Sequence, residues 1–410
     1  MKTVLILSSV AVLLFTGLFL LEERVTAEWS GVQREYRDLL RELDAESKLE
    51  LSVGLRQVYL PEMKRVDRCV SCHLAIEDPR FSEQAEPLRT HPGDYLETHD
   101  PLRFGCTACH DGQGRATTWK DALAWDDEVH WNKPILVPPF LEANCYRCHE
   151  GELEQTPVYN RGKQIFESHG CLGCHRREGK GGYLGPELRG IGDAFTRLKH
   201  PVDEHRDELL PRFDGNRNLA YIYEAVRFPS AQPTNSVMLD FGFSDDDALA
   251  LSVYLKSLTE PLPGMTSVPA PWKRPQELVA RGRETFLLYC RACHGQAGSG
   301  GVTNPNYVGG TIPALDGLAE QFLLYDKPSV ERFIAMLEQF GDLNRADPPP
   351  DLPRYPAVLA RYNAIRDQIL NGAWAGKRDP KGPAPFNMPS WRKSLTDDEL
   401  SAVIAYLVSQ

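Results

Sequence analysis

All ten cysteines of this chain fall into five pairs with the spacing Cys-x-x-Cys, and a histidine follows each pair directly. The spacing matches the attachment signature of c-type haem, in which both thiols form thioethers with vinyl groups and the histidine becomes an axial ligand of the iron. The sequence therefore predicts five covalently bound haem c groups, held by Cys69, Cys72, His73, Cys106, Cys109, His110, Cys145, Cys148, His149, Cys171, Cys174, His175, Cys290, Cys293 and His294.

Two other uses of paired cysteines compete with haem attachment. A zinc site takes cysteine and histidine ligands, but it does not require a histidine at the same position behind every pair. A redox-active dithiol enzyme normally carries one such pair rather than five. The uniform placement of the histidines therefore favours haem.

The second axial ligand of each iron has to come from elsewhere in the chain. Three histidines, His91, His99 and His130, lie among the first three motifs, so we expect them to complete three bis-histidine haems. The sequence leaves open which histidine serves which haem. Three others are not expected to be ligands, because the first is too close to its own motif and the other two lie in a charged run that suits solvent: His169, His200 and His205.

Methionine is the expected second ligand for the last two haems. Met388, in the stretch FNMPSW, precedes the closing helix of the chain, and Met238, in SVMLDF, has the corresponding place in an earlier segment. A methionine that is not a ligand usually fills core space, and we expect Met63, Met265 and Met336 to be such filler or part of a linker. The predicted iron ligands are therefore the five motif histidines with His91, His99, His130, Met238 and Met388.

The chain has to position these groups outside the cytoplasm. Its first residues read MKTVLILSSVAVLLFTGLFLL, and the uncharged run from Val4 to Leu21 would form a helix of about 27 Å, close to the roughly 30 Å of a bilayer core. A cleaved secretory signal is the alternative, but the run is longer than the ~7–15 residues of a usual signal core. We expect an anchor in the inner membrane with Lys2 on the cytoplasmic side and the haem domains on the periplasmic side.

The net charge of the chain restricts the classes of partner that it can bind. The 410 residues carry a formal net charge of −11, and no segment concentrates the basic charge that nucleic-acid phosphates require. The sequence therefore predicts no nucleic-acid binding. The overall charge favours partners that present basic patches.

The segments that follow the anchor differ in pattern. Residues 28–47 are amphipathic and predict a helix leading away from the membrane. Residues 61–158 hold three motifs and many prolines but no long periodic segment, so we expect haem groups to fill their interior in place of an ordinary apolar core.

The rest of the chain contains an internal repeat. The stretches RGKQIFESHGCLGCH from Arg161 and RGRETFLLYCRACH from Arg281 each predict a short helix that leads into a motif, and each is followed much later by a methionine and a closing helix. Start signals for the closing helices are Ser244-Asp245-Asp246-Asp247 and the capping box Thr396-Asp397-Asp398-Glu399. A proline-rich stretch between the repeats reads as an extended spacer.

These patterns predict a mainly α protein made of an N-terminal transmembrane helix, a haem-packed module with little secondary structure, and two α-helical domains. The expected boundaries are 1–27 for the anchor, 28–60 for the amphipathic helix and connector, 61–158 for the trihaem module, 159–260 for the first helical domain, 261–275 for the linker and 276–410 for the second helical domain.

The two helical domains resemble class I cytochrome c domains, on the basis of the helix before each motif, the Gly185-Pro186-Glu187-Leu188 loop and the later methionine. This resemblance implies that the carbonyl of Pro186 orients His175, and that Pro313 does the same for His294. The leucine that follows Met238 and the proline-rich insertion of the last domain depart from the family pattern.

The segment from VDRCVSCH through FGCTACHDGQGRAT to NCYRCHE is similar to the trihaem portion of membrane-anchored multihaem cytochromes that accompany cytochrome b and Rieske-type quinol-oxidising complexes. If every iron has both axial positions filled, no position is vacant for a substrate, so we expect an electron-transfer subunit rather than an enzyme. Electrons would pass from the quinol-oxidising subunits through bis-histidine haems to histidine–methionine haems, and then to a soluble cytochrome or a terminal reductase.

Two other functions stay open. One is a dihaem peroxidase in the C-terminal half, which would need one five-coordinate haem, and the other is an extracellular conductive multihaem cytochrome. The donor, the acceptor, the potentials and spatial order of the haems, the cleavage of the anchor and the subunit stoichiometry do not follow from the sequence.

Overall fold

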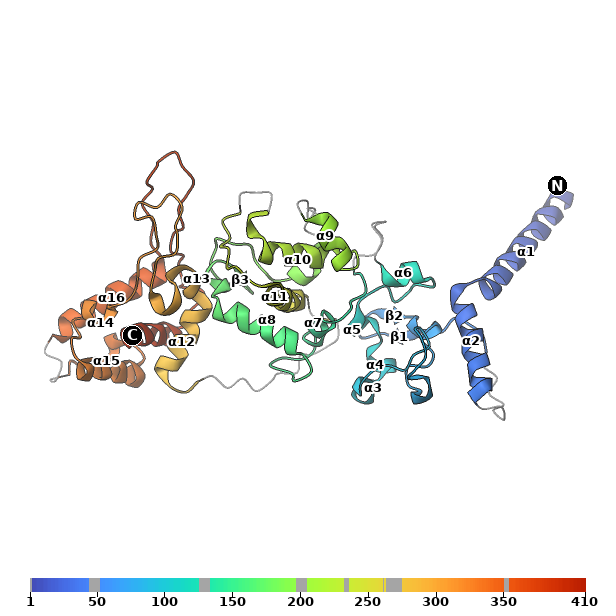
Figure 1. Cartoon of the computed structure of the whole chain (residues 1–410), viewed down its shortest axis with the longest axis horizontal. Coiled ribbons are helices and arrows are strands. Elements are labelled where there is room, and N and C mark those ends of the chain that lie inside the picture. Colours follow the sequence, from blue (N-terminus) through green and yellow to red (C-terminus); the bar gives the residue numbers. More distant parts are fainter. Residues whose placement is uncertain are drawn as a thin grey trace. The chain divides into compact units, whose positions relative to one another are not determined.

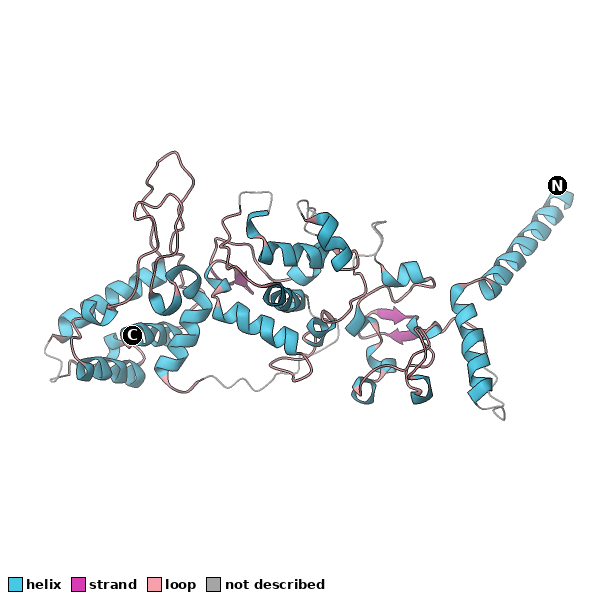
Figure 2. Ribbon diagram, viewed as in Figure 1, coloured by secondary structure: helices cyan, strands magenta, loops and turns pink. Residues whose placement is uncertain are grey.

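The computed structural model describes residues 2–43, 52–124, 133–196, 205–231, 236–260, 262, 275–349 and 354–410 (Figure 1). The chain divides into two compact units. Unit 1 comprises Met1–Glu150, Asp193–Glu224 and Glu260–Val268, and unit 2 comprises Gly151–Gly192, Ala225–Thr259 and Pro269–Gln410. Helices make up most of the regular structure (Figure 2), so the predicted mainly α class is confirmed.

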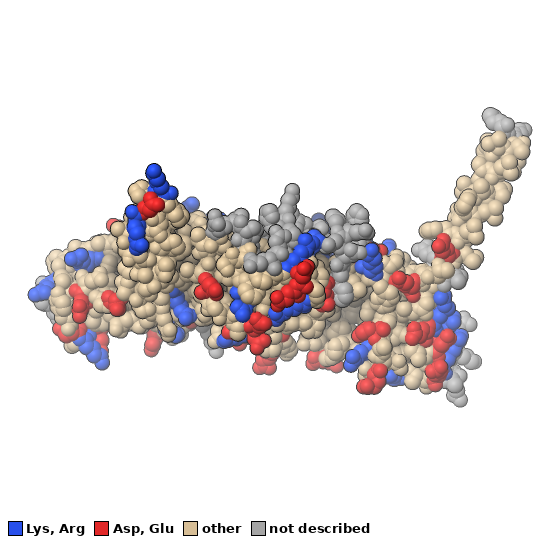
Figure 3. All heavy atoms as spheres, turned by 45° about the horizontal axis from the view of Figure 1, so that its top comes forward, with Lys and Arg blue, Asp and Glu red and all other residues tan. Residues whose placement is uncertain are grey.

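The N-terminal helix α1 (Lys2–Val25) contains the apolar run. Its stretch Thr3–Glu22 is long and apolar enough to cross a membrane, and none of it is buried within the protein. Figure 3 shows this helix as a rod that is almost free of charged atoms. A signal sequence has the same properties, so the helix supports a membrane anchor only weakly.

The amphipathic helix α2 (Glu28–Leu43) buries one face in unit 1. Tyr36 packs on Phe81 with ring centroids 5.1 Å apart, and the Gln33 side chain donates to the carbonyl of Ser71 at 2.9 Å. The helix is therefore fixed next to the first motif rather than being an independent solvated helix.

The rest of unit 1 has little regular structure. Strands β1 (Val58–Leu60) and β2 (Arg65–Asp67) form one antiparallel pair, in which Val58 lies opposite Asp67. The five helices between residues 95 and 145 have only four or five residues each: α3 (Tyr95–Thr98), α4 (Pro101–Phe104), α5 (Thr107–His110), α6 (Trp119–Leu123) and α7 (Leu141–Cys145). The later helices are α9 (Arg206–Arg212) and α10 (Arg217–Arg227), the last of which extends into unit 2.

Unit 2 contains two pairs of crossing helices. Helix α8 (Pro157–Ser168) packs on α11 (Asp245–Ser257), and α12 (Leu278–Tyr289) packs on α17 (Asp397–Val408). Both closing helices begin at the predicted caps, since Ser244 accepts a hydrogen bond from the backbone of Asp247, and Thr396 forms a capping box with Glu399.

The C-terminal part of unit 2 adds further helices to the second pair: α13 (Arg291–His294), α14 (Leu318–Gln321), α15 (Lys327–Phe340) and α16 (Tyr355–Asn371). Their apolar faces join α12 and α17 in one core that contains Phe286, Phe333 and Tyr362, all fully buried. The only strands assigned in the described part of unit 2 are β3 (Arg176–Arg177) and β4 (Lys180–Gly181), which pair antiparallel. Most of the predicted linker lies outside the described residues.

Candidate haem sites

All five motifs adopt the same local conformation. In each, the backbone N–H of the histidine donates to the carbonyl of the first cysteine four residues earlier, at 2.8 to 3.0 Å. One helical turn therefore carries both thiols and the imidazole of each motif. None of the ten cysteines forms a disulfide, so the sulfur of each is available for attachment of a haem.

The surroundings of four motif histidines favour the neutral imidazole that a metal binds. Burial lowers the pKa of His73, His110, His175 and His294, because desolvation disfavours the charged imidazolium. A metal ligand has to be deprotonated, so this shift favours ligation at neutral pH.

Two of the additional histidines face motif histidines in unit 1. The ring centroids of His91 and His110 are 6.1 Å apart, and those of His99 and His149 are 6.0 Å apart. A metal–imidazole bond is about 2 Å long, so two such bonds plus half of each ring give roughly 6 Å between centroids. Each pair therefore has the spacing needed to hold one iron between its two rings.

The remaining ring nitrogens orient the two additional histidines. Nδ1 of His91 donates to the carbonyl of Pro92 at 2.9 Å, and Nδ1 of His99 donates to the carbonyl of Tyr95 at 3.1 Å. A carbonyl can only accept, so Nδ1 carries the proton in both rings and Nε2 keeps its lone pair for a metal.

The partner of the first motif cannot be assigned in the same way. His130, the third predicted ligand of this module, lies outside the described residues. The ring of His73 lies 6.3 Å from that of Trp119, and its Nδ1 is 3.6 Å from the carboxylate of Glu86.

In unit 2 the fourth motif has the proline contact that the resemblance implies. Nδ1 of His175 donates to the carbonyl of Pro186 at 3.0 Å, which leaves Nε2 for a metal. Gly185 allows this approach, because a Cβ there would lie 2.6 Å from the imidazole. In the fifth motif, the backbone of Pro313 lies close enough to His294 to affect its pKa. Among the described residues, however, Nδ1 of His294 has no hydrogen-bond partner.

The two methionines proposed as ligands are both half-buried. Met388 forms an isolated antiparallel bridge with Ala373, with N–O distances of 3.0 and 3.1 Å. Met238 lies in an irregular stretch before α11. Met63 and Met336 are each 3% exposed and pack in apolar clusters, as expected of core filler, while Met265 lies outside the described residues. The axial roles of Met238 and Met388 stay predictions.

The motifs adjoin one another within each unit. In unit 2, the thiols of Cys293 and Cys174 lie close enough to interact, and this interaction lowers the pKa of Cys174. In unit 1, Cys106 and Cys69 interact in the same way. Cys109 lies close enough to Cys148 for their charges to interact. The attachment points are thus contiguous from the first motif to the third, and from the fourth to the fifth.

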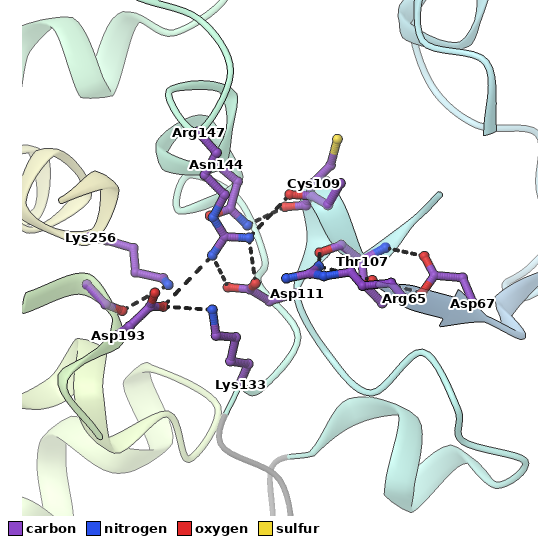
Figure 4. A network of polar contacts seen from close by, with 12 residues as sticks. Arg65, Asp67, Thr107, Cys109, Asp111, Lys133, Asn144, Arg147, Asp193 and Lys256 are labelled. Carbon is purple, nitrogen blue, oxygen red and sulfur yellow. Dashed lines mark hydrogen bonds and ion pairs between the residues drawn. The ribbon is translucent and has the colours of Figure 1, made fainter. Parts of the chain in front are cut away.

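A buried carboxylate, Asp67, supports the second motif (Figure 4). Asp67 is 1% exposed and accepts hydrogen bonds from the backbone of Cys106 at 2.7 Å and of Thr107 at 2.8 Å. A Cβ at Gly105 or Gly114 would lie within 2.5 Å of its oxygens, so the two glycines make room for the carboxylate. Arg65 extends the network by donating to the carbonyl of Thr107 at 2.9 Å.

A buried ion pair joins the second motif to the third. Arg147, between the cysteines of the third motif, contacts Asp111, directly after the second, at 2.8 Å, and both side chains are 1% exposed. Asn144 donates to the carbonyl of Cys109 at 2.6 Å. Asp193, which is 3.1 Å from Lys133, adds a second carboxylate at 4.0 Å from Arg147 (Figure 4). Nothing in the sequence distinguishes these charges from surface residues, so their role was missed.

The histidines that were not expected to be ligands have other surroundings. His169 packs edge-on against Phe243, with ring centroids 5.1 Å apart, and its Nδ1 contacts the carbonyl of Ile165 at 2.9 Å. His205, which we expected in solvent, is half-buried, because its Nδ1 contacts the buried carboxylate of Glu224 at 3.1 Å. His200 lies outside the described residues.

Comparison with known proteins agrees with the repeat in the second half of the chain. The family profile described as cytochrome c matches residues 159–259 and 279–410. A subunit of the nitric oxide reductase of Stutzerimonas stutzeri is 44% identical over 46 residues, which is 11% of this chain and 30% of that protein. Cytochrome c oxidase subunit 2 of Alkalihalophilus pseudofirmus is 29% identical over 110 residues, which is 27% of this chain and 28% of that protein.

The matched stretches span less than a third of either relative. No solved structure matches the chain significantly.

Proposed function

The chain belongs to the cytochrome c family, and from this we propose that it is a membrane-anchored pentahaem electron-transfer protein. It would take electrons from a quinol-oxidising complex and pass them to a periplasmic acceptor. Bound haem c supplies reversible one-electron chemistry at its iron. The proposal gives the five sets of motif residues the task of holding that cofactor.

The facing imidazoles are the observation that carries the proposal. At the 6.1 Å and 6.0 Å separations of the pairs His91–His110 and His99–His149, the two imidazoles of each pair would hold one haem iron between them. A site with both axial positions filled transfers electrons without binding a substrate. This favours an electron-transfer role over an enzymatic one for the haems of the second and third motifs.

The order of the ligands supports a direction. Methionine in place of the second histidine raises a haem potential when other surroundings are similar. Three bis-histidine sites near the anchor and two histidine–methionine sites in residues 159–260 and 276–410 would therefore favour electron flow away from the membrane. Contact between Cys69 and Cys106, and between Cys174 and Cys293, supports serial transfer within each unit.

The partners belong to the same proposal. Both named relatives are subunits of respiratory oxidoreductases, and α1 supplies a segment able to lie in a membrane. We propose cytochrome b and Rieske-type subunits, or another quinol-oxidising pair, as the donor. A soluble cytochrome or a terminal reductase would be the acceptor.

Removing one facing histidine should free one axial position on one haem iron. In His91→Ala or His99→Ala, carried in the haem-loaded protein, we expect one haem of the five to become high-spin and to bind carbon monoxide. Added imidazole should restore the low-spin spectrum, since it can enter the space of the missing ring. The measurement is the absorption spectrum of the reduced protein with and without carbon monoxide.

His169→Ala is the matched control, because His169 is a half-buried histidine that faces no motif histidine among the described residues. This variant should bind no carbon monoxide. If His91→Ala and His99→Ala retain five low-spin haems and bind no carbon monoxide, the proposed ligand pairs are wrong.

The function is tested by isolating the native membrane complex. The mass of the chain should equal that of the polypeptide plus five haem groups, a cytochrome b should accompany it, and added quinol should reduce its haems. Recovery with a molybdopterin reductase or a secreted oxidase, or turnover of peroxide by the resting protein, would contradict the proposal.

A further inference from the structure

Two segments of the last domain pair to form a projection, and the proposed ligand Met388 lies at the end of one of them (Figure 1). We call residues 302–311 together with residues 373–388 the projection. Tyr307 bridges Lys377, and the backbone of Val308 donates to the carbonyl of Gly376 at 2.9 Å. Asn304 binds both the N–H and the carbonyl of Phe386, at 2.7 and 3.0 Å.

A second asparagine secures the outer end of the projection. The side chain of Asn306 donates to the carbonyls of Asp379 at 2.8 Å and Pro383 at 2.7 Å, and accepts from the N–H of Asp379 at 2.7 Å. Its backbone carbonyl also accepts from Arg378 at 2.8 Å. Such dense pairing makes the projection an ordered surface rather than a loose loop.

The projection presents an exposed tryptophan. Trp374 is 92% exposed and Val308 is 63% exposed. Residues 373 and 377 both pair with neighbouring segments, so the stretch between them is extended, and Trp374 and Gly376 point to one face. A Cβ on Gly376 would meet the Val308 side chain at 3.3 Å, which brings Val308 to the same face. Tryptophan in such a position is the residue type most enriched among binding hot spots.

The charge of the projection is opposite to that of the whole chain. Residues 373–388 contain three basic residues, Lys377, Arg378 and Lys381, and one acidic residue, Asp379, on a protein of net charge −11. The Arg378 side chain reaches the other segment of the projection, where a Cβ on Gly310 would lie 3.0 Å from its Nη2. Figure 3 shows charged side chains of both signs at the end of the projection. The surface therefore suits an acidic partner, whereas the chain as a whole favours basic ones.

The projection is continuous with the proposed ligand of the fifth haem. Ala373, the residue before Trp374, is the bridge partner of Met388. A protein bound to Trp374 would thus contact the residue next to Ala373, whose backbone pairs with this methionine. The exposed tryptophan is therefore next in the chain to a residue that pairs with the proposed ligand of the fifth haem.

We propose that the face of the projection formed by Trp374, Val308 and Arg378 is the docking surface for an acidic, soluble electron-transfer protein. This rests on the proposed function, because it takes the fifth site as the exit for electrons. Trp374 supplies the apolar anchor of the interface. Arg378 and Lys381 supply the steering charge.

The test measures oxidation of the fully reduced pentahaem protein in a stopped-flow instrument. Two oxidised probes are used: an acidic plastocyanin-type copper protein and a basic mitochondrial-type cytochrome c. With the acidic probe we expect the second-order rate constant to fall as salt increases, and to fall about tenfold in the double variant Arg378→Glu/Lys381→Glu, since steering charges change association rates by that order or more. Trp374→Ala should slow the acidic probe by about tenfold at all salt concentrations.

Lys327→Glu is the matched control, because it reverses an exposed lysine at the start of α15 in the same unit. It should leave the rate with the acidic probe within a factor of two or so of the wild type, because a distant exposed charge is screened. The double variant changes the net charge twice as much as Lys327→Glu does. If Lys327→Glu lowers the logarithm of the rate constant by half as much as the double variant, only net charge matters and the proposal is overturned. An unchanged rate in both Trp374→Ala and the double variant would also overturn it.

Other occupants give different results. Concentration-dependent dimers that Trp374→Ala abolishes would assign the face to a second copy of the chain, and sedimentation with anionic lipid vesicles that the same variant abolishes would assign it to a membrane. Either result overturns docking of an acidic protein. Redox titration separates this test from the function itself, because all these variants should keep five haems with wild-type potentials even where docking is lost.

Discussion

Replacement of Met388 by histidine is expected to lower the highest haem potential of the protein. A thioether ligand stabilises ferrous haem relative to a second imidazole, so the change from methionine to histidine lowers the midpoint. Axial ligands set haem potentials over a span of about 0.8 V, and we expect a shift on the order of 0.1 V for one haem. Met238→His should produce the same shift in a second haem. The measurement is a potentiometric titration followed in the visible absorption bands.

Alanine variants and a core methionine complete this experiment. Met388→Ala and Met238→Ala should also lose their high-potential transitions, and each should expose one haem to carbon monoxide. Met336→Leu is the control, because Met336 is a methionine of the same unit that is 3% exposed and packs among apolar side chains. Its titration should match that of the wild type. If the two highest transitions are unchanged in both Met388 and Met238 variants, the assignment of methionine ligands is wrong.

The local features of the fold were predictable because they depend on residues close together in sequence. A cap needs a hydroxyl and a backbone N–H within one turn, so the caps at Ser244 and Thr396 could be read from four residues each. The same holds for the motifs, whose thiols and histidine lie on a single turn. The hydrogen bond from His175 to Pro186, only eleven residues away, followed from the family resemblance.

The pairing of the spare histidines was not predictable. His99 faces His149 across fifty residues, and the described part of this segment, 100–124 and 133–148, contains short helices and irregular structure. No periodicity constrains such a path, so the sequence named the ligands but not their partners. The ring of His91 meets that of His110 rather than that of the nearer motif histidine. Each of these two histidines thus faces a motif that follows it in the chain.

Buried charges were missed for a related reason. Asp67 and Asp111 each lie within two residues of a motif cysteine or histidine, yet acidic residues are mostly exposed, so their types predict solvent. The free-energy cost of burying these carboxylates is offset by partners from far along the chain. Asp111 pairs with Arg147, and Asp67 accepts hydrogen bonds from the backbone of Cys106 and Thr107. Only the tertiary structure brings those partners within reach.

The crossing of α12 and α17 should not tolerate a side chain at Gly282. A Cβ at this position would lie 1.9 Å from the carbonyl oxygen of Ala402 and 2.8 Å from Cβ of Tyr406. Both contacts are with backbone or its first side-chain atom, so neither can swing away and the helices would have to separate. Overpacking of this kind costs typically 1–3 kcal/mol, and we expect Gly282→Val to be at or above the upper end. Gly162 has the same environment at the other crossing, 1.9 Å from the carbonyl oxygen of Ala250, and should behave alike.

Two effects oppose each other in the smaller variant Gly282→Ala. Alanine is favoured over glycine within a helix by up to about 1 kcal/mol, whereas the backbone clash costs more than that, so the net effect should be destabilising. Gly31 in α2 is the matched control, because a Cβ there would meet nothing closer than a flexible arginine side chain at 4.0 Å. Gly31→Ala should therefore stabilise its helix.

Guanidinium unfolding, followed by the far-red charge-transfer band of methionine-ligated ferric haem, reports on the proposed C-terminal sites alone. Its midpoint should fall in Gly282→Ala and in Gly162→Ala, and stay at the wild-type value in Gly31→Ala. A midpoint that rises in Gly282→Ala and in Gly162→Ala would mean that helix propensity outweighs the clash. The two helices of each pair would then lie farther apart than the Cβ–oxygen distance of 1.9 Å indicates. Glycine would not be needed where the helices cross.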